Sequence, residues 1–453
     1  MQDIKIAAAL LPKLIQRQQI YKIIILKILC ISPRFAPVNA ADSHRLRLLL
    51  PYLADQGCDV EILAVSADDV SGPQDSWLSS QLPKSLKIHW VNAPNLAIWG
   101  MNGLAQRSFV SMYRKGCDLL ACGDFDLIFF STTEFLLHGL GPLWQRKFGV
   151  PFCMDFQDPW VNDYYRQNPK VVPPGGRFKY AVIDKLHRFA ERAVVQRCSG
   201  FLSVSSAYIP LLEQRYGSSV AYQPRMVAGF PAEPTEIAVC APQKIPIPKS
   251  LGCKTWRYIG RGGDDMTKAA QSFFQSWNHA VKIEVINAED VQFETIGTSY
   301  AAAARSVKSF EPLVAGTTIH KQVSETPARL GYSDMLNCLM ASDALIVFGS
   351  DDPAYTASKI YPYLLSGKPL LAIFHEKSSV VSLMHAVGGG VCITFNEKTS
   401  PDELAHDVFQ GWFYLNQFNR VVPLDMLAFE PYTARVQAKD ISCWFGEVII
   451  HAC

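Results

Sequence analysis

The chain has 453 residues, of which 49% are hydrophobic and 19% charged, a composition that disfavours disordered, fibrous and coiled-coil proteins. With 43 Lys and Arg against 41 Asp and Glu, the formal charge is only +2, so no overall basic field indicates a nucleic-acid partner. The twelve cysteines are scattered, without a CxxC pair or a His–Cys cluster, as is typical of reduced, buried thiols. We therefore expect a cytoplasmic protein of two large domains that needs no bound metal and no cofactor.

Residues 1–26 form an N-terminal extension in which basic side chains alternate with apolar ones. Residues 1–50 together carry eight basic and two acidic side chains. No apolar run here approaches the roughly 18 residues that a membrane-spanning helix needs. The extension is therefore a candidate for peripheral contact with an anionic membrane face. An ordinary packed extension, or a start of translation further along the chain, is the alternative.

Strands and helices alternate from residue 27 to residue 230. Short apolar runs predict strands at 27–32, 60–65, 126–131, 151–156 and 200–205. Amphipathic segments predict helices at 43–56, 135–148, 177–197 and 207–216. Because uninterrupted apolar strands separated by helices are typical of a parallel sheet covered on both faces, we expect a doubly wound α/β domain at 27–230.

A proline-rich linker is expected at 231–250, and the alternation then restarts in a second domain at 251–420. Strands are predicted at 255–260, 291–296, 318–323, 344–348, 369–374 and 390–395. Helices are predicted at 266–281, 301–310, 333–340, 359–365 and 378–386. Residues 421–453 are predicted to be a helical tail that can cross back to the first domain. Ligands of doubly wound sheets bind outside the carboxyl ends of the strands, so two such domains would face one cleft.

A glycine loop follows the first strand of the second domain and leads into its first helix. Gly260, Gly262 and Gly263 permit close approach of a ligand to the backbone, and the helix start favours an anion. Arg261 can grip two phosphate oxygens, and Lys268 adds a mobile charge. The sequence therefore predicts a diphosphate site here, although a glycine turn with two solvated cations is the alternative. The spacing matches neither a Walker loop nor a G-x-G-x-x-G loop.

A second candidate anion site lies where the strand at 344–348 leads into the next helix. It would use Thr356, Ser358 and Lys359 at the helix start. The neighbouring Asp351 and Asp352 could cap the helix, bind sugar hydroxyls or hold a metal, and capping is favoured because no further carboxylates stand at metal spacing.

The first domain carries candidate residues for a second substrate. Asp155 and Asp158 stand at the end of the strand predicted at 151–156, and an aromatic loop with Trp160 and Tyr164 follows them. Carboxylates there can bind hydroxyls or move protons, and aromatic rings can cover a sugar. Asp158 could instead cap a turn closed by Pro159. His138 and Asn39 complete the candidate set, although a structural role is favoured for His138.

Four segments together resemble the GT-B glycosyltransferases of the large group 1, or family 4, class. They are KILCISPRFAPVNAADSHRLRLLLPYLADQGCDVEIL, FGVPFCMDFQDPW, YIGRGGDDMTK and ASKIYPYLLSGKPLLAIF, and the resemblance covers most of residues 27–445. It implies two Rossmann-like domains facing a cleft, with a nucleotide-sugar donor on the second, a glycan or lipid-linked acceptor on the first, and a retaining, metal-independent reaction.

Carried over to this sequence, the resemblance assigns the donor diphosphate to Arg261 and Lys268 and the nucleotide side to Ser358 and Lys359. Asp158 stands beside the position where many relatives have a histidine, and so becomes the candidate for sugar orientation or proton transfer. The family's Glu-x7-Glu acids are replaced by Ala354 and Pro362, so the donor nucleotide is not identified. A sugar-nucleotide epimerase of the same fold and a catalytically inactive binding scaffold are the alternatives.

Overall fold

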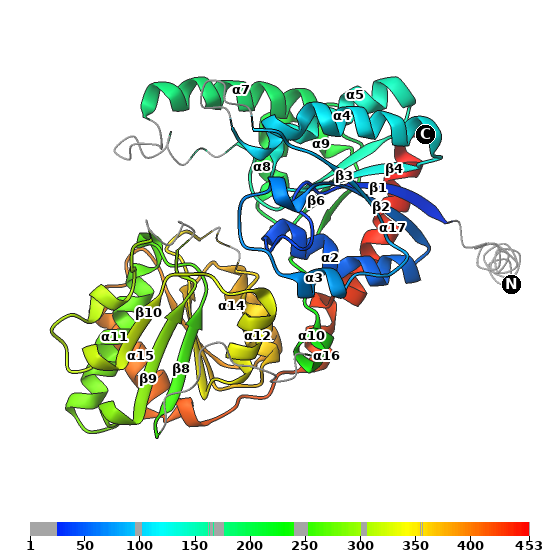
Figure 1. Ribbon diagram of the computed structural model, residues 1–453. Coiled ribbons are helices and arrows are strands. Elements are labelled where there is room, and N and C mark those ends of the chain that lie inside the picture. The colour runs from blue at the N-terminus through cyan, green and yellow to red at the C-terminus, as the bar shows by residue number, and fades with distance from the viewer. Residues whose placement is uncertain are drawn as a thin grey trace, which may run out of the picture.

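The computed structural model describes residues 25–95, 102–161, 163, 166, 176–239, 252–299, 306–353, 355 and 357–452. It contains two sheets, one of seven and one of six strands, in which every pair of neighbouring strands is parallel. The two doubly wound domains predicted from the sequence are thereby confirmed, and Figure 1 shows them one above the other. Most of the N-terminal extension (residues 1–24), together with Tyr164 and Thr356, lies outside the described residues.

The first sheet orders its strands β3-β2-β1-β4-β5-β6-β7. In that order they span Lys87–Val91, Cys58–Val65, Leu26–Ile31, Leu127–Ser131, Phe152–Phe156, Gly200–Ser203 and Arg225–Val227. The helices between them are α2 (Ala41–Asp55), α3 (Ser76–Ser80), α4 (Leu104–Cys122), α5 (Leu140–Phe148), α7 (Arg177–Val195), α8 (Tyr208–Tyr216) and α9 (Ser218–Ala221). A 3-10 helix, η2 (Phe135–Gly139), precedes α5.

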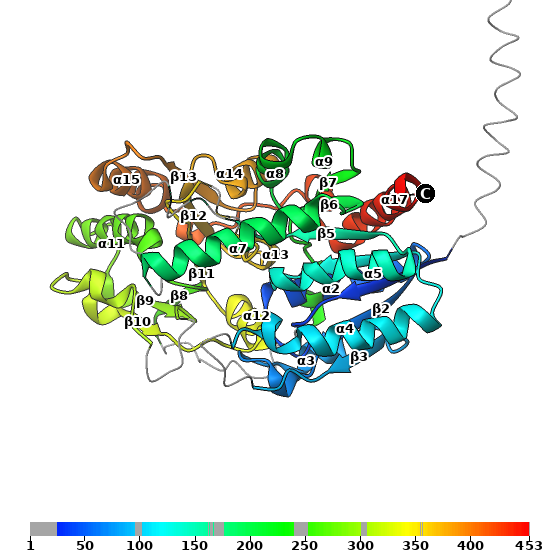
Figure 2. The ribbon, with the colours of Figure 1, turned by 90° about the horizontal axis from the view of Figure 1, so that it is seen from above.

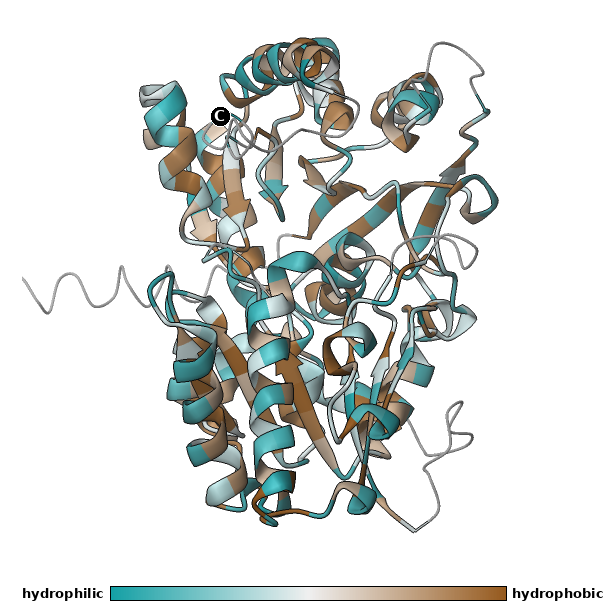
Figure 3. Cartoon of the chain, turned by 90° about the vertical axis from the view of Figure 1, so that its left-hand side faces the viewer, coloured by the Kyte–Doolittle hydropathy of each residue, from teal (hydrophilic) through white to brown (hydrophobic). Residues whose placement is uncertain are grey.

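The second sheet orders its strands β10-β9-β8-β11-β12-β13. They span Val323–Thr326, Val291–Ile296, Lys254–Ile259, Ala344–Phe348, Leu370–His375 and Val391–Phe395. The main helices are α11 (Thr267–Lys282), α12 (Tyr332–Met340), α13 (Ile360–Leu365), α14 (Ser379–Val387) and α15 (Pro401–Val408). In Figure 3 the central strands of both sheets are brown, in keeping with their complete burial between the helical layers.

Two strands of the first sheet were not predicted. β3 and β7 lie at the two edges, where one side of a strand has no neighbour and polar residues are tolerated. In β3, Lys87 and His89 both contact Glu61 of the adjacent strand, at 3.0 and 2.7 Å. Their polar side chains therefore belong to the sheet, although they interrupt the apolar run that would have signalled a strand.

The segment between β9 and β10 also differs from the prediction. A helix was expected at 301–310, but residues 306–310 are not helical, and the expected strand at 318–323 instead contains the 3-10 turn η7 (His320–Gln322). The buried carboxylate of Glu325 accepts the backbone N–H groups of Ser309, Phe310 and Glu311 at 2.8 to 2.9 Å. These donors bind a side chain of β10 rather than the carbonyls of a helix, which explains the irregular path.

The linker and the C-terminal tail connect the two domains. The expected linker contains a short helix, α10 (Pro234–Val239), followed by residues outside the described part. After α16 (Met426–Phe429), the long α17 (Ala434–Ala452) packs against α2 in the first domain. There Phe445 lies 5.0 Å from Phe129 of β4, measured between ring centroids. Figure 1 shows α17, in red, beside the strands of the first sheet.

Candidate functional site

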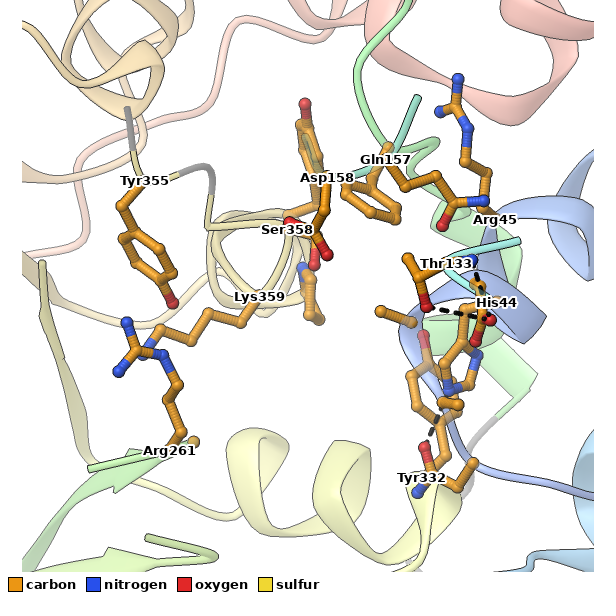
Figure 4. A pocket seen from close by; sticks show the side chains of 18 of the residues that line it. His44, Arg45, Thr133, Gln157, Asp158, Arg261, Tyr332, Tyr355, Ser358 and Lys359 are labelled. Atoms are coloured by element: carbon orange, nitrogen blue, oxygen red, sulfur yellow. Dashed lines mark hydrogen bonds between the residues drawn. The ribbon is translucent and has the colours of Figure 1, made fainter. Parts of the chain in front are cut away.

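A cavity of about 1420 Å³ lies between the two domains. Its walls include loops that follow the carboxyl ends of strands in both sheets, where doubly wound folds bind ligands, together with parts of α2, α12 and α13. Figure 4 shows Arg261, Tyr355, Ser358 and Lys359 around the cavity together with Thr133, Gln157 and Asp158 of the first domain. The two predicted halves of the site are thus brought together in one space.

The glycine loop begins at the end of β8, and Gly260 lines the cavity whereas Gly262 and Gly263 do not. The loop offers few free backbone donors to an anion, because the N–H groups of Gly260 and Gly262 bond the carbonyls of Ile296 and Thr298. A Cβ at Gly260 would lie 3.1 Å from both Cδ and Nζ of Lys359. Glycine at 260 therefore leaves room for a lysine side chain that crosses over the loop.

Arg261 lies at the cavity wall and is held in place from two sides. Its guanidinium forms two hydrogen bonds to the Asp265 carboxylate, at 2.7 and 2.9 Å, and lies 4.7 Å from the ring centroid of Tyr355. Asp265 belongs to the 3-10 helix η3 (Asp264–Met266), which leads into α11. The guanidinium is thus pre-oriented beside the cavity, where the Asp265 carboxylate and an incoming anion would share it.

Lys268, the expected second cation, does not line the cavity. Its ammonium donates to the backbone carbonyl of Asn396 at 2.8 Å and lies over the Phe395 ring, both at the end of β13. Lys359 occupies the place beside Arg261 instead, as Figure 4 shows. Its Nζ donates to the Tyr258 hydroxyl at 2.5 Å, and that hydroxyl donates to the Arg261 carbonyl.

The environment of Lys359 disfavours its charged form. Desolvation lowers the pKa of this amine well below its ordinary value, and the positive charges of Arg261 and Arg329 act in the same direction. Asp265 is the nearby group that opposes them. An anion bound between Arg261 and Lys359 would place a negative charge beside the amine and so favour its charged form.

Asp351 and Asp352 also line the cavity, but neither caps the helix as was favoured. α13 begins only at Ile360, with Lys359 as the residue before its first turn. Desolvation and the nearby carboxylates of Asp265 and Asp352 raise the pKa of Asp351. Of the alternatives from the sequence, binding of sugar hydroxyls fits this placement.

On the first domain, Asp158 faces the cavity next to a small polar cluster. Desolvation, and then the charge of Asp42, raise the pKa of Asp158, while Arg34 opposes them. Arg34 bridges Asp42 at 3.3 Å and Glu134 at 3.0 Å, and donates to the Thr133 hydroxyl at 2.7 Å. Asp158 therefore presents a carboxyl group of raised proton affinity at this wall, an arrangement suited to accepting a proton.

Three first-domain candidates do not reach the cavity. Asp155 is buried in an ion pair with Arg45 at 2.5 Å, so it anchors β5 to α2. The Trp160 ring is buried against Phe135, with centroids 5.8 Å apart. His138 is buried too, and desolvation lowers its pKa to about 4, which fits the structural role favoured for it from the sequence.

Asn39 does line the cavity, beside residues that sequence motifs did not reveal. Its side-chain oxygen lies 2.9 Å from Nε2 of His44, whose ring lies 4.3 Å from that of Tyr332 in the second domain. Desolvation, and next the charge of Arg47, lower the pKa of His44 well below its usual range, so this imidazole is neutral at neutral pH. Its Nε2 donates to the Asn39 oxygen and its Nδ1 accepts from Arg47 at 3.2 Å, so the ring orients Asn39 and adds no charge to the site.

Among the residues that the structure describes, no group of three or more His, Cys, Asp and Glu side chains could hold a metal ion. The described helices also include none with the length and apolarity needed to cross a bilayer.

No family model and no curated protein sequence matches this chain. Several solved structures are similar to it. HepE of Anabaena, crystallised with UDP-glucose, has a TM-score of 0.55 and 14% identity, over 92% of this chain and 98% of HepE. A glycosyltransferase of Rickettsia africae has a TM-score of 0.60 and 12% identity, over 93% and 98%.

A Listeria monocytogenes protein provisionally assigned as a UDP-N-acetylglucosamine 2-epimerase has a TM-score of 0.51 and 11% identity, over 92% of this chain and 94% of that protein. At these identities the likeness establishes the fold. The chain has the GT-B fold, as its two parallel sheets and the cleft between them also show.

Proposed function

We propose that this protein transfers a sugar from a nucleotide-sugar donor to an acceptor hydroxyl. The observation that carries the proposal is the pairing, across one cavity, of a cationic glycine loop on the second domain with a carboxylate cluster on the first. The cation side suits a diphosphate, and the carboxylate side suits hydroxyl groups that must lose a proton. The structural likeness to HepE, which was crystallised with UDP-glucose, supports a nucleotide-sugar donor.

On the donor side, Arg261 and Gly260 would hold the diphosphate, with Lys359 as the second cation in place of Lys268. As the bond between sugar and diphosphate breaks, negative charge grows on the departing phosphate oxygens. Arg261 is already oriented by Asp265 and Tyr355, so it can stabilise this charge with little reorganisation. Ser358, Asp351 and Asp352, which line the same cavity, would bind hydroxyls of the nucleotide or the sugar.

On the acceptor side, Asp158 would take the proton of the attacking hydroxyl. Its raised pKa makes its carboxylate a better base than an exposed aspartate, and Arg34 keeps the neighbouring Asp42 paired. Asn39, oriented by its hydrogen bond with His44, would offer a neutral hydrogen-bonding group to an acceptor glycan or lipid-linked sugar. A retaining stereochemical course, a cytoplasmic location and a role in polysaccharide or glycolipid assembly accompany this proposal.

The proposal is tested by measuring release of nucleoside diphosphate from a panel of nucleotide sugars, with and without candidate acceptors. Release that depends on an acceptor and yields a glycosylated product supports transfer. Interconversion of nucleotide sugars without an acceptor would instead establish the epimerase. Binding of a nucleotide sugar with no turnover under any condition would establish the scaffold.

We predict that the activity persists in excess chelator. The cations that face the diphosphate are protein side chains, so no divalent ion is needed to neutralise the leaving group. The measurement is turnover after treatment with EDTA, compared with turnover in added Mg²⁺ or Mn²⁺. Complete loss that either ion reverses would contradict this and would make Asp351 and Asp352 metal ligands.

Asp158→Asn is predicted to lower turnover by about 10²–10⁴, the usual contribution of a general base. The wild-type rate should fall at acidic pH, because a carboxyl group of raised pKa keeps its proton to higher pH, and the variant should lack this dependence. Stability should not fall, since the folded protein disfavours the ionised form that asparagine replaces. Near-parental turnover with an unchanged pH profile would remove Asp158 from the mechanism.

A further inference from the structure

Helix α7 presents an apolar stripe to solvent. Five large apolar side chains are strongly exposed along it, namely Phe178 (86%), Val182 (46%), Ile183 (40%), Leu186 (61%) and Phe189 (76%). Phe178, Val182, Leu186 and Phe189 follow one another at intervals of four, four and three residues, so they share one face of the helix. Elsewhere in the described chain, large exposed apolar side chains come singly or in pairs on different elements. Such a stripe on a soluble fold marks an interaction surface.

Cations border this stripe. Lys185 and Arg192 are exposed, and at 3.6 residues per turn they project immediately beside the line of Phe178 and Phe189. The acids of α7 lie on the opposite side, where Asp184 pairs with Arg188 at 2.9 Å and the buried Glu191 pairs with Arg215. The exposed face of the helix is therefore apolar and positive, while its acids are used inside the domain.

The neighbouring helices extend the positive surface. α4 and α5 contact each other, all three helices contact η2, and Figures 1 and 2 show them in one layer on the same face of the first sheet. Together α4, α5 and α7 contain ten Lys and Arg but only three Asp and Glu, in a chain whose net charge is +2. Arg114, Arg146 and Lys147 are exposed in this layer, and so are the apolar Val110 and Leu143.

We propose that the layer of α4, α5 and α7 docks the protein onto an anionic lipid surface, with the α7 stripe inserted among the acyl chains. Transfer of apolar side chains out of water lowers the free energy, and so does the attraction between the flanking cations and anionic headgroups. A purely anionic partner such as a nucleic acid would use the cations but leave five apolar side chains in water. A lipid surface uses both features of the layer.

Docking there would place the membrane near the first-domain wall of the cavity. Arg188 of α7 binds Asp163 at 2.5 Å, and Asp163 lines the cavity. Under the proposed function, an acceptor attached to a lipid would approach the site from this side. The docking itself does not depend on the reaction, because the stripe and its cations are separate from the donor loop.

The test is sedimentation of the full-length protein with phosphatidylcholine vesicles that contain or lack phosphatidylglycerol. We expect binding to the anionic vesicles that weakens as salt is added. The variant Phe178→Ser/Leu186→Ser/Phe189→Ser should bind at least about tenfold more weakly, because three large apolar side chains no longer leave water. These side chains are exposed, so the variant should fold normally, which its thermal unfolding and nucleotide binding would verify.

Leu427→Ser/Ile450→Ser is the matched control, since those side chains are 80% and 78% exposed but lie on α16 and α17. It should bind vesicles as the wild type does. Equal vesicle binding by the α7 variant and the wild type would overturn the proposal, as would no binding at low salt. Loss of binding only on deletion of residues 1–22 would assign the contact to the N-terminal extension. A wild-type dimer that the α7 variant dissociates, without vesicle binding by either, would make the stripe a contact between two copies.

Discussion

Arg261→Ala is expected to lower turnover by about 10²–10³, the scale of losing one donor that stabilises charge in the transition state. Arg261 lies at the cavity wall, and its guanidinium is fixed by two hydrogen bonds to Asp265 and by the ring of Tyr355. A fixed guanidinium can bind two oxygens of the leaving diphosphate, and alanine offers none. Steady-state kinetics with the preferred nucleotide sugar would measure the loss.

Two controls separate this role from a structural one. Arg261→Ala leaves the Asp265 carboxylate without its partner, and this unpaired charge could by itself repel the donor. The double variant Arg261→Ala/Asp265→Asn removes that charge, and it should remain as slow as the single variant. Recovery in the double variant would show that Arg261 merely neutralises Asp265. Arg420→Ala, which removes an exposed arginine outside the cavity, should be fully active.

Lys359→Met is expected to weaken binding of the nucleotide sugar by at least about tenfold, the smaller end of what a charged hydrogen bond contributes. Lys268→Met should have little effect, because the Lys268 ammonium is engaged with the Asn396 carbonyl outside the cavity. Calorimetric titration of both variants and the wild type would measure the difference. The reverse ranking would restore Lys268 to the diphosphate site.

The same titrations should show that donor binding takes up a proton at Lys359. In the empty site, burial and the charges of Arg261 and Arg329 hold the pKa of this amine well below its usual value, against the opposing charge of Asp265. Within the described chain, the amine also donates a hydrogen bond to the Tyr258 hydroxyl. A bound diphosphate raises that pKa, so affinity should fall as pH rises through the value in the empty protein, by up to about tenfold per pH unit.

Proton uptake is read from the dependence of the binding enthalpy on the ionisation enthalpy of the buffer. The wild type should show uptake, and Lys359→Met should show none. Nucleotide-sugar binding without uptake in the wild type would mean that Lys359 is charged already in the empty site. In that case the affinity should be independent of pH.

The central strands and most helices could be predicted because their apolar runs and amphipathic periods are strong local signals. β9 and β11 match the predicted ranges at both ends. The edge strand β3 was not predicted, because its lysine and histidine interrupt the apolar run and are explained by their contacts with Glu61 of the neighbouring strand. The prediction of a helix at 301–310 was wrong over its described part. The backbone N–H groups of Ser309 and Phe310 there bind the carboxylate of Glu325 in the later strand β10, which the local sequence does not reveal.

Some residues of the candidate site could likewise be predicted from the sequence, and others could not. Arg261 and Lys359 could be found because each belongs to a loop that follows a strand of the sheet. Asp155 and Trp160 also stand near the end of a strand, but their side chains turn into the domain, which spacing along the chain does not reveal. Arg34 and His44 lie in the first of the family-like segments, but the sequence did not single them out. Their places at the site depend partly on Glu134 and Tyr332, which are distant in the sequence.

We infer that the cavity between the domains holds a nucleoside diphosphate against Arg261. A thermal-shift screen of nucleoside diphosphates and their sugars, run in parallel on the wild type, Arg261→Ala and Arg420→Ala, tests this inference. We predict that one nucleotide family raises the unfolding temperature of the wild type and of Arg420→Ala but not that of Arg261→Ala. No shift with any nucleotide, or the same shift in all three proteins, would contradict it.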